Sequence, residues 1–220
     1  MDLRVCNLLD VSKTIACSLF NNVEYTWEVL PKIKDYIILL GKNLPRDKYD
    51  ILNENVFVSK SAKIFPSAYI DGPAIIDEGA EVRHCAFIRG SAIIGKNSVV
   101  GNSTELKNVI LFDNVQVPHY NYVGDSVLGF KAHMGAGSIT SNVKSDKTLV
   151  TVKTELDKIE TGLKKFGAIL GDNVEVGCNT VLNPGTVVGR NTSIYPLSMV
   201  RGYIPDNSIY KSGDEIIRRK

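Results

Sequence analysis

Residues 88–106 read IRGSAIIGKNSVVGNSTEL, and every sixth residue is aliphatic: Ile88, Ile94, Val100 and Leu106. The same spacing reaches back to Val58, so that nine aliphatic residues follow one another at intervals of six. This period fits neither an α-helix, with a repeat of about 3.6 residues, nor a single amphipathic strand, with a repeat of about 2. It is typical of a chain wound in triangular coils, with one short strand per side and each aliphatic residue pointing to the axis.

The repeat continues after two steps of five residues instead of six. Its later members are Leu111, Val117 and Val123, then Leu128, Met134 and the polar Thr140, and finally Leu170, Val176, Leu182, Val188, Ile194 and Val200. Glycine or asparagine follows many of them, and both tolerate the positive φ that a corner needs. These 21 inward positions, at three per coil, predict an all-β solenoid of about seven coils.

The first 52 residues lack the repeat. We expect them to form a helical unit that caps the N-terminal end of the prism. Asp10 is placed to cap a short helix that ends near Leu19, and a second helix is expected over 23–40. Pro31 should kink this second helix or mark its start.

A second interruption covers residues 143–167. Two short β-prone runs flank residues 154–157, which predicts a hairpin or long loop that leaves the coils. We therefore expect the β-helix to occupy residues 53–210 with this insert, followed by a tail over 211–220.

The composition limits the possible partners. Lys and Arg total 26 and Asp and Glu total 24, a net charge of +2 that argues against nucleic acid as a partner. No apolar run approaches the roughly 20 residues of a membrane span. The four cysteines form no CxxC pair, which favours reduced thiols and a cytoplasmic location.

Two stretches carry a family resemblance: VPHYNYVGD at 117–125 and MGAGSITSN at 134–142. They resemble the left-handed parallel β-helix acyltransferases, and most closely the acetyltransferase half of the bifunctional uridylyltransferase/glucosamine-1-phosphate acetyltransferases. The resemblance implies a left-handed coil and a homotrimer with active sites between neighbouring prisms. It also implies transfer of acetyl from acetyl-CoA to glucosamine 1-phosphate or galactosamine 1-phosphate, a reaction of UDP-N-acetylglucosamine biosynthesis. The Gly-rich nucleotide loop of that family is missing here, so uridylyl transfer is not expected.

Arg89 and Lys107 are 18 residues apart, which is one full coil. Two cations on neighbouring strands repel one another unless an anion lies between them. A phosphate is the natural candidate, and the resemblance places the substrate phosphate at these two residues.

His119 is the candidate general base, because an imidazole can accept the proton that an attacking amine must lose. Tyr122 lies one turn of strand away and is expected to bind the sugar or its phosphate. The resemblance places His133 and Asn142 against the amino sugar and the acyl group, although the family has Asn where His133 stands.

Acetyl-CoA is the expected co-substrate, and no metal is required for this reaction. Small residues around Ala136 let a backbone amide approach a thioester carbonyl and stabilise its oxyanion. The resemblance places the coenzyme near Cys178, Pro196, Arg201 and Lys211, the last two against its phosphates.

Three alternatives remain at this point. The acceptor can be a sugar nucleotide, or the chain can be a β-helix scaffold without catalytic activity. A zinc hydratase on the same fold needs three converging histidines, and the chain has only His84, His119 and His133.

Overall fold

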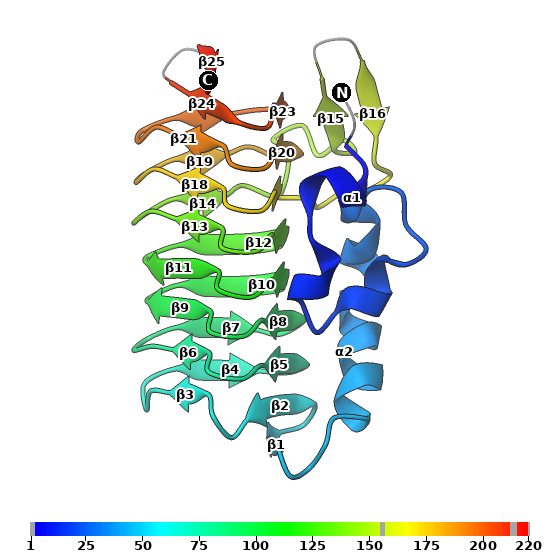
Figure 1. Ribbon diagram of the computed structural model, residues 1–220, viewed down its shortest axis with the longest axis vertical. Coiled ribbons are helices and arrows are strands. Elements are labelled where there is room, and N and C mark those ends of the chain that lie inside the picture. Colours follow the sequence, from blue (N-terminus) through cyan, green and yellow to red (C-terminus); the bar gives the residue numbers. More distant parts are fainter. Residues whose placement is uncertain (1–2, 155–156, 212–214, 220) are drawn as a thin grey trace.

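The computed structural model describes residues 3–154, 157–211 and 215–219. Its first part is helical: α1 (Val5–Leu8), the 3-10 turns η1 (Val11–Lys13), η2 (Cys17–Phe20) and η3 (Thr26–Lys32), and α2 (Ile33–Lys42). The rest is a parallel β-solenoid with three flat faces, as predicted from the six-residue repeat (Figure 1).

The strands of each face pair in parallel from one coil to the next. The first face holds β2 (Val56–Ser59), β5 (Ala74–Ile76), β8 (Ala92–Ile94), the second halves of β10 (Glu105–Leu111) and β12 (Tyr122–Leu128), β17 (Ala168–Leu170), β20 (Thr186–Val188) and β23 (Tyr203–Ile204). The second holds β3 (Lys63–Ile64), β6 (Glu81–Val82), β9 (Val99–Asn102), β11 (Gln116–His119), β13 (His133–Met134), β18 (Glu175–Val176), β21 (Ser193–Ile194) and β24 (Ser208–Tyr210). The third holds β4 (Tyr69–Asp71), β7 (Phe87–Arg89), the first halves of β10 and β12, β14 (Ile139–Thr140), β19 (Val181–Leu182) and β22 (Met199–Val200).

The predicted inward residues form three columns along the axis. On the first face Val58 pairs with Ile76 and Ile76 with Ile94, each 18 residues further on. Ile94 then pairs with Leu111, 17 residues on, because the five-residue step removes one residue from that coil. The first column continues past the predicted series to Ile204, so the described prism is slightly longer than seven coils.

Thr140 is the one polar member of the inward series, and a hydrogen bond accounts for it. Its side chain is fully buried, and its hydroxyl accepts the backbone N–H of Gly124 at 2.8 Å. The same hydroxyl lies 3.3 Å from the Gly124 carbonyl oxygen. Thr140 therefore holds the backbone of β12 in place from inside the prism.

The helical segment lies along the first face and does not cap the end of the prism, which corrects our expectation (Figure 1). Helix α2 contacts β5, β8 and β10, and η3 contacts β12. The outward residues of this face are aliphatic as well as the inward ones, and burying both sides of a sheet requires a second layer. These outward, fully buried residues are Ile75, Ile93, Ile110, Val127, Ile169 and Val187.

The local structure of this segment also differs from the expectation. Asp10 does act as a cap, since its carboxylate accepts the Ser12 N–H at 3.1 Å, but the turn that follows is only η1. Pro31 lies in η3, and the α-helix begins two residues later at Ile33. The end of the prism is instead covered by β1 (Tyr49–Asn53), which pairs antiparallel with β2.

The insert forms the predicted hairpin from β15 (Thr151–Lys153) and β16 (Lys158–Glu160), which pair antiparallel. It leaves the solenoid after β14 and packs against the corner between the third and first faces. A Cβ added at Gly202 would lie 2.6 Å from the Lys153 carbonyl oxygen, so this corner fits the hairpin only with glycine. The described end of the chain forms β25 (Ile216–Arg218), an antiparallel edge strand on β24 and not a free tail.

Replacing Thr140 with Val should lower the free energy of unfolding by about 1–3 kcal/mol, although Val is more hydrophobic and similar in shape. The Gly124 N–H would then be buried without an acceptor. Urea denaturation measures the difference, and Thr140→Ser, which keeps the hydroxyl, should lose less. An unchanged midpoint for Thr140→Val would show that this hydrogen bond contributes nothing.

Candidate functional site

The outward side chains of the third face form two columns that flank the inward one. The first column is Tyr69, Phe87, Glu105, Tyr122, Ile139, Val181 and Met199. The second column follows each inward residue and is Asp71, Arg89, Lys107, Gly124, Ser141, Asn183 and Arg201. Arg89 and Lys107 are therefore neighbours on adjacent coils, as their spacing predicts.

Each of these two cations already has a carboxylate partner. Arg89 Nη1 donates to Glu105 Oε1 at 2.7 Å, and Lys107 Nζ donates to both oxygens of Asp125 at 3.1 and 3.2 Å. A guanidinium has five donors and an ammonium three, so both side chains retain donors for an anion. The Arg89 side chain is 47% exposed and can turn toward a ligand.

Asp125 is the centre of the cluster, and the sequence analysis did not identify it. Its side chain is 5% exposed. Besides Lys107 it accepts Asn108 Nδ2 at 2.9 Å and Asn142 Nδ2 at 2.6 Å. The spacing gave a signal for this, since Asn108, Asp125 and Asn142 follow one another at 17 residues, the length of a shortened coil.

Tyr122 joins this cluster through Asn142, and its expected contact with the sugar stays a prediction. The Asn142 amide donates to its phenol oxygen at 3.2 Å. Burial is the main cause that raises the pKa of Tyr122, with smaller contributions from Asp125 and Glu105. The phenol therefore stays protonated near neutral pH and can donate a hydrogen bond.

His119 lies at the corner between the second and third faces. Its ring is exposed, and within the described residues the imidazole makes no hydrogen bond. Backbone hydrogen bonds join this corner of each coil to the same corner of the next coil. They run from the Gly137 N–H to His119 O, from the Asn179 N–H to Ala136 O, and from the Leu197 N–H to Cys178 O. The corner column from the N-terminal side is His84, Asn102, His119, Ala136, Cys178 and Pro196.

Ala136, Cys178 and Pro196 therefore form one line that leads directly away from His119. The amides of Gly135 and Gly137 are used in backbone hydrogen bonds to Val176 and His119. In the described chain the Ala136 amide between them donates none, so it is available to an acceptor on this corner.

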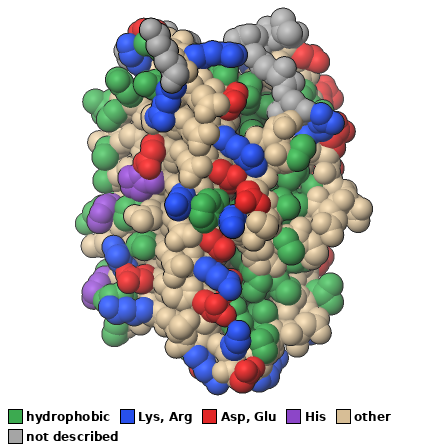
Figure 2. Space-filling model, viewed as in Figure 1, with side chains coloured by type: hydrophobic (Ala, Val, Ile, Leu, Met, Phe, Trp, Pro, Cys, Tyr) green, Lys and Arg blue, Asp and Glu red, His purple; other side chains and the backbone are tan. Residues whose placement is uncertain are grey.

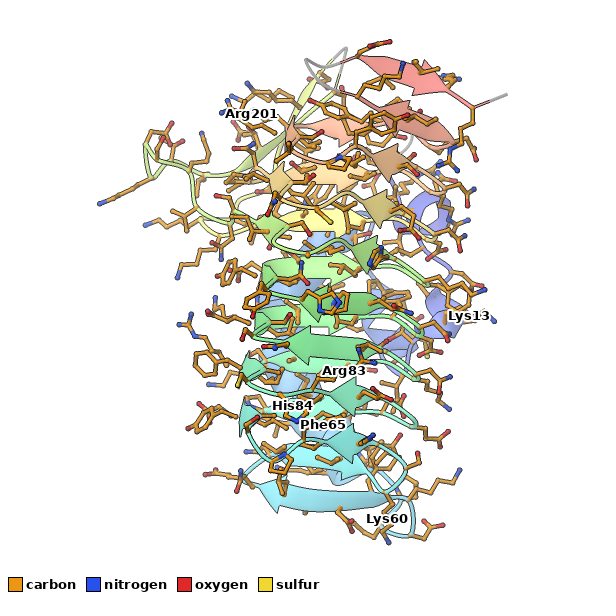
Figure 3. All side chains as sticks on the ribbon, turned by 90° about the vertical axis from the view of Figure 1, so that its left-hand side faces the viewer. Lys13, Lys60, Phe65, Arg83, His84 and Arg201 are labelled. Carbon is orange, nitrogen blue, oxygen red and sulfur yellow. The ribbon has the colours of Figure 1, made fainter. Side chains whose placement is uncertain are left out.

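The structure does not bring every predicted residue to this face. His133 lies on the second face, where its Nδ1 is 2.8 Å from Glu175 Oε2. Lys211 follows β24 on the second face and pairs with Glu215 at 3.4 Å. Arg201 does belong to the third face and lies near the C-terminal end of the prism, far along the axis from His84 (Figure 3).

The surface shows no single-sign patch on the side drawn in Figure 2, where acidic and basic side chains alternate along the prism. Among the residues that the structure describes, no helix combines the length and hydropathy of a membrane span.

Comparison with known proteins places the chain in a family. A model described as the GMPPB C-terminal domain matches residues 70–192. The chain belongs to this family. The uncharacterized acetyltransferase YaiX of Escherichia coli O6:K15:H31 is a relative with 32% identity over 192 residues, 85% of this chain and 83% of that protein.

The predicted resemblance to the β-helix acyltransferases is confirmed by further relatives of this chain. The bifunctional protein GlmU of Methanococcus vannielii is 37% identical over 118 residues, 54% of this chain. The match spans 28% of that protein's length. Among solved structures, a hexapeptide transferase family protein from Anaplasma phagocytophilum has 15% identity and a TM-score of 0.42, covering 74% of this chain and 78% of that one.

Removing Lys107 should destabilise the protein more than removing Arg89. Lys107→Met leaves the buried Asp125 carboxylate without its cation and should cost about 1–3 kcal/mol of unfolding free energy. Arg89→Met should change it little, because that ion pair is exposed. Urea unfolding of both variants at one pH provides the comparison, and an equal loss in the two would contradict the assigned burial of the Asp125 pair.

Proposed function

We propose that this protein is an acetyl-CoA-dependent N-acetyltransferase that acts on the amine of an amino-sugar 1-phosphate, glucosamine 1-phosphate or galactosamine 1-phosphate. The observation that carries the proposal is the position of His119. Along the axis, the coil of His119 follows the coils of Arg89 and Lys107 and precedes those of Ala136, Cys178 and Pro196. A base between an acceptor site and a donor channel is what direct acyl transfer requires.

The acceptor phosphate binds to Arg89 and Lys107, and the sugar lies beside Tyr122 and Asn142. Asp125 fixes Lys107 and Asn142 at short distance, so the Lys107 ammonium and the carbonyl oxygen of the Asn142 amide meet the substrate in a prepared position. The phosphate displaces no carboxylate, because both cations keep spare donors. The Tyr122 phenol and the Asn142 amide contribute neutral hydrogen bonds to the sugar.

His119 removes the proton of the amine as its nitrogen attacks the thioester carbonyl. The C–N bond forms, the C–S bond breaks, and the coenzyme leaves as its thiolate, which takes up a proton. The Ala136 N–H donates to the developing oxyanion. No covalent acyl-enzyme is needed, so Cys178 contributes contact area only.

Acetyl-CoA lies along the corner with its thioester at Ala136 and its pantetheine arm past Cys178 and Pro196. The adjacent outward residues Ile139, Val181 and Met199 give this half of the third face an apolar lining. Arg201 and Lys211 lie at the C-terminal end of the prism, where the phosphates of the coenzyme would be bound.

We further propose a homotrimer in the cytoplasm, with each active site between two prisms. His119 and the corner line are open to the outside in a single chain. A neighbouring prism would exclude water from the thioester, and His133 and Lys211 on the second face could then serve the site of another copy.

The second candidate acceptor is a sugar nucleotide. A scaffold without catalytic activity predicts no binding of coenzyme A and no turnover. The zinc hydratase is disfavoured, because His133 pairs with Gln116 and lies outside the corner column of His84 and His119, with its Nδ1 2.8 Å from Glu175 Oε2.

His119→Ala should lower kcat about 10²- to 10⁴-fold, because the general base is lost. The assay follows thiol release from acetyl-CoA with glucosamine 1-phosphate or galactosamine 1-phosphate. His84→Ala is the matched control, since it removes an exposed imidazole from the same corner column, and it should retain full activity. Equal activity of the two variants would exclude His119 as the base.

Cys178→Trp should raise the KM for acetyl-CoA at least tenfold by blocking the corner line, with little effect on the KM of the acceptor. His84→Trp places the same indole on the corner on the other side of His119 and should leave the KM for acetyl-CoA unchanged. If both substitutions act equally, the coenzyme does not follow this corner.

A further inference from the structure

The corner between the third and first faces carries a polar side chain on three consecutive coils: Asn108, Asp125 and Asn142. Asn108 and Asp125 have positive φ angles of 55° and 48°, which asparagine and aspartate tolerate better than most residues. The Asn108 amide nitrogen donates to Asp125 Oδ1 at 2.9 Å and to the Leu30 carbonyl oxygen of η3 at 3.3 Å. Asn108 therefore joins the carboxylate at the centre of the site to the helical segment on the first face.

A second connection runs through the main chain at the end of the insert. The Phe166 N–H donates to Asn142 O at 3.0 Å, and the Gly167 N–H donates to Asp125 O at 2.8 Å. A Cβ added at Gly167 would lie 2.3 Å from the Gly124 carbonyl oxygen, so the chain passes here in direct contact with β12. The insert thus returns to the solenoid against the backbone of Asp125 and Asn142.

The helical segment packs on this return of the chain. The Phe166 side chain is fully buried, and its ring centroid lies 5.8 Å from that of Trp27 in η3. Trp27 is itself buried and stacks on Tyr25, with ring centroids 4.6 Å apart and 4° between the planes. Asn108 through its amide and Trp27 through Phe166 therefore connect η3 to the same cluster.

We propose that η3 of the helical segment is part of the acceptor site and that Asn108 is its positioning residue. The inference rests on the proposed function and adds residues that touch no substrate. Asn108 holds the Asp125 carboxylate, and that carboxylate orients the Lys107 ammonium and the Asn142 amide. Without Asn108 the carboxylate can rotate, and the two groups that meet the substrate lose their prepared position.

A layer that only stabilised the fold would not need these contacts. The segment already packs on the first face through apolar rings, as Phe20 does against Phe112 with centroids 5.6 Å apart. The contacts of Asn108 are polar, and they end on a carboxylate whose side chain is only 5% exposed. Hydrogen bonds are directional and apolar packing is not, so this amide fixes an orientation.

Affinity for the acceptor tests the inference without catalysis, by calorimetry with glucosamine 1-phosphate and galactosamine 1-phosphate. Asn108→Gly removes the amide and suits the positive φ. It should weaken binding of the sugar phosphate that the wild type prefers about tenfold. Asn191→Gly is the matched control, because Asn191 has a φ of 56° and its amide donates to Asn207 on another corner. It should leave the affinity unchanged.

Two aromatic variants test the packing of the helical segment. Trp27→Leu and Phe20→Leu each remove a ring that contacts a buried aromatic residue of the prism, so both should lower the stability measured by urea unfolding. At a temperature where every variant is folded, only Trp27→Leu should also weaken binding of the sugar phosphate. In thiol-release assays, Asn108→Gly and Trp27→Leu should lower kcat/KM for the acceptor and leave the KM for acetyl-CoA unchanged.

Equal affinity of Asn108→Gly and Asn191→Gly for the sugar phosphate would overturn the inference. So would a loss of affinity in Phe20→Leu as large as that in Trp27→Leu, because it would reduce the segment to a source of stability. A wild type that binds neither sugar phosphate would exclude the acceptor site and this inference with it. Binding without thiol release would contradict the proposed reaction alone, and the calorimetry would still decide the role of Asn108.

Discussion

The alignment of successive coils is the constraint on which the rest of the molecule depends. Each aliphatic side chain on the axis packs against the equivalent residue one coil away, as Ile76 does against Val58 and Ile94. A shift of one residue would turn every inward side chain outward, so packing fixes the pairing of all three faces at once. Because of this alignment, residues that are 17 or 18 positions apart in the sequence are direct neighbours in space. Every column of the candidate site is a set of such neighbours.

The inward columns make the three faces alike, and the outward residues make them different. The first face is aliphatic on its outer side and is covered by the helical segment. The third face carries charged and polar side chains in its middle coils, where Asp125 gathers Lys107, Asn108 and Asn142. Thr140 links this cluster to the axis, because its hydroxyl binds the Gly124 backbone next to Asp125.

The sequence was sufficient to predict the solenoid, its inward residues, the hairpin insert and the stacking of Arg89 on Lys107. All of these depend on a strict period. Consecutive aliphatic residues such as Ile75 and Ile76 indicate that both sides of the first face are buried. We did not predict the helical layer on this face, because a helical cap at the end of the prism also buries apolar surface. The role of Asp125 was missed for a different reason. Its contacts come from separate coils, and a carboxylate at a corner is ordinarily expected to be exposed to solvent. Only when the two five-residue steps are included in the register do Asn108, Asp125 and Asn142 become neighbours.

A crystal structure of the protein with coenzyme A and glucosamine 1-phosphate tests the central claim most directly. We predict the pantetheine arm along Ala136, Cys178 and Pro196, with the thiol beside His119 and the sugar phosphate on Arg89 and Lys107. Coenzyme A bound along another corner of the prism, or a phosphate bound away from Lys107, would contradict the assignment of the third face as the active site.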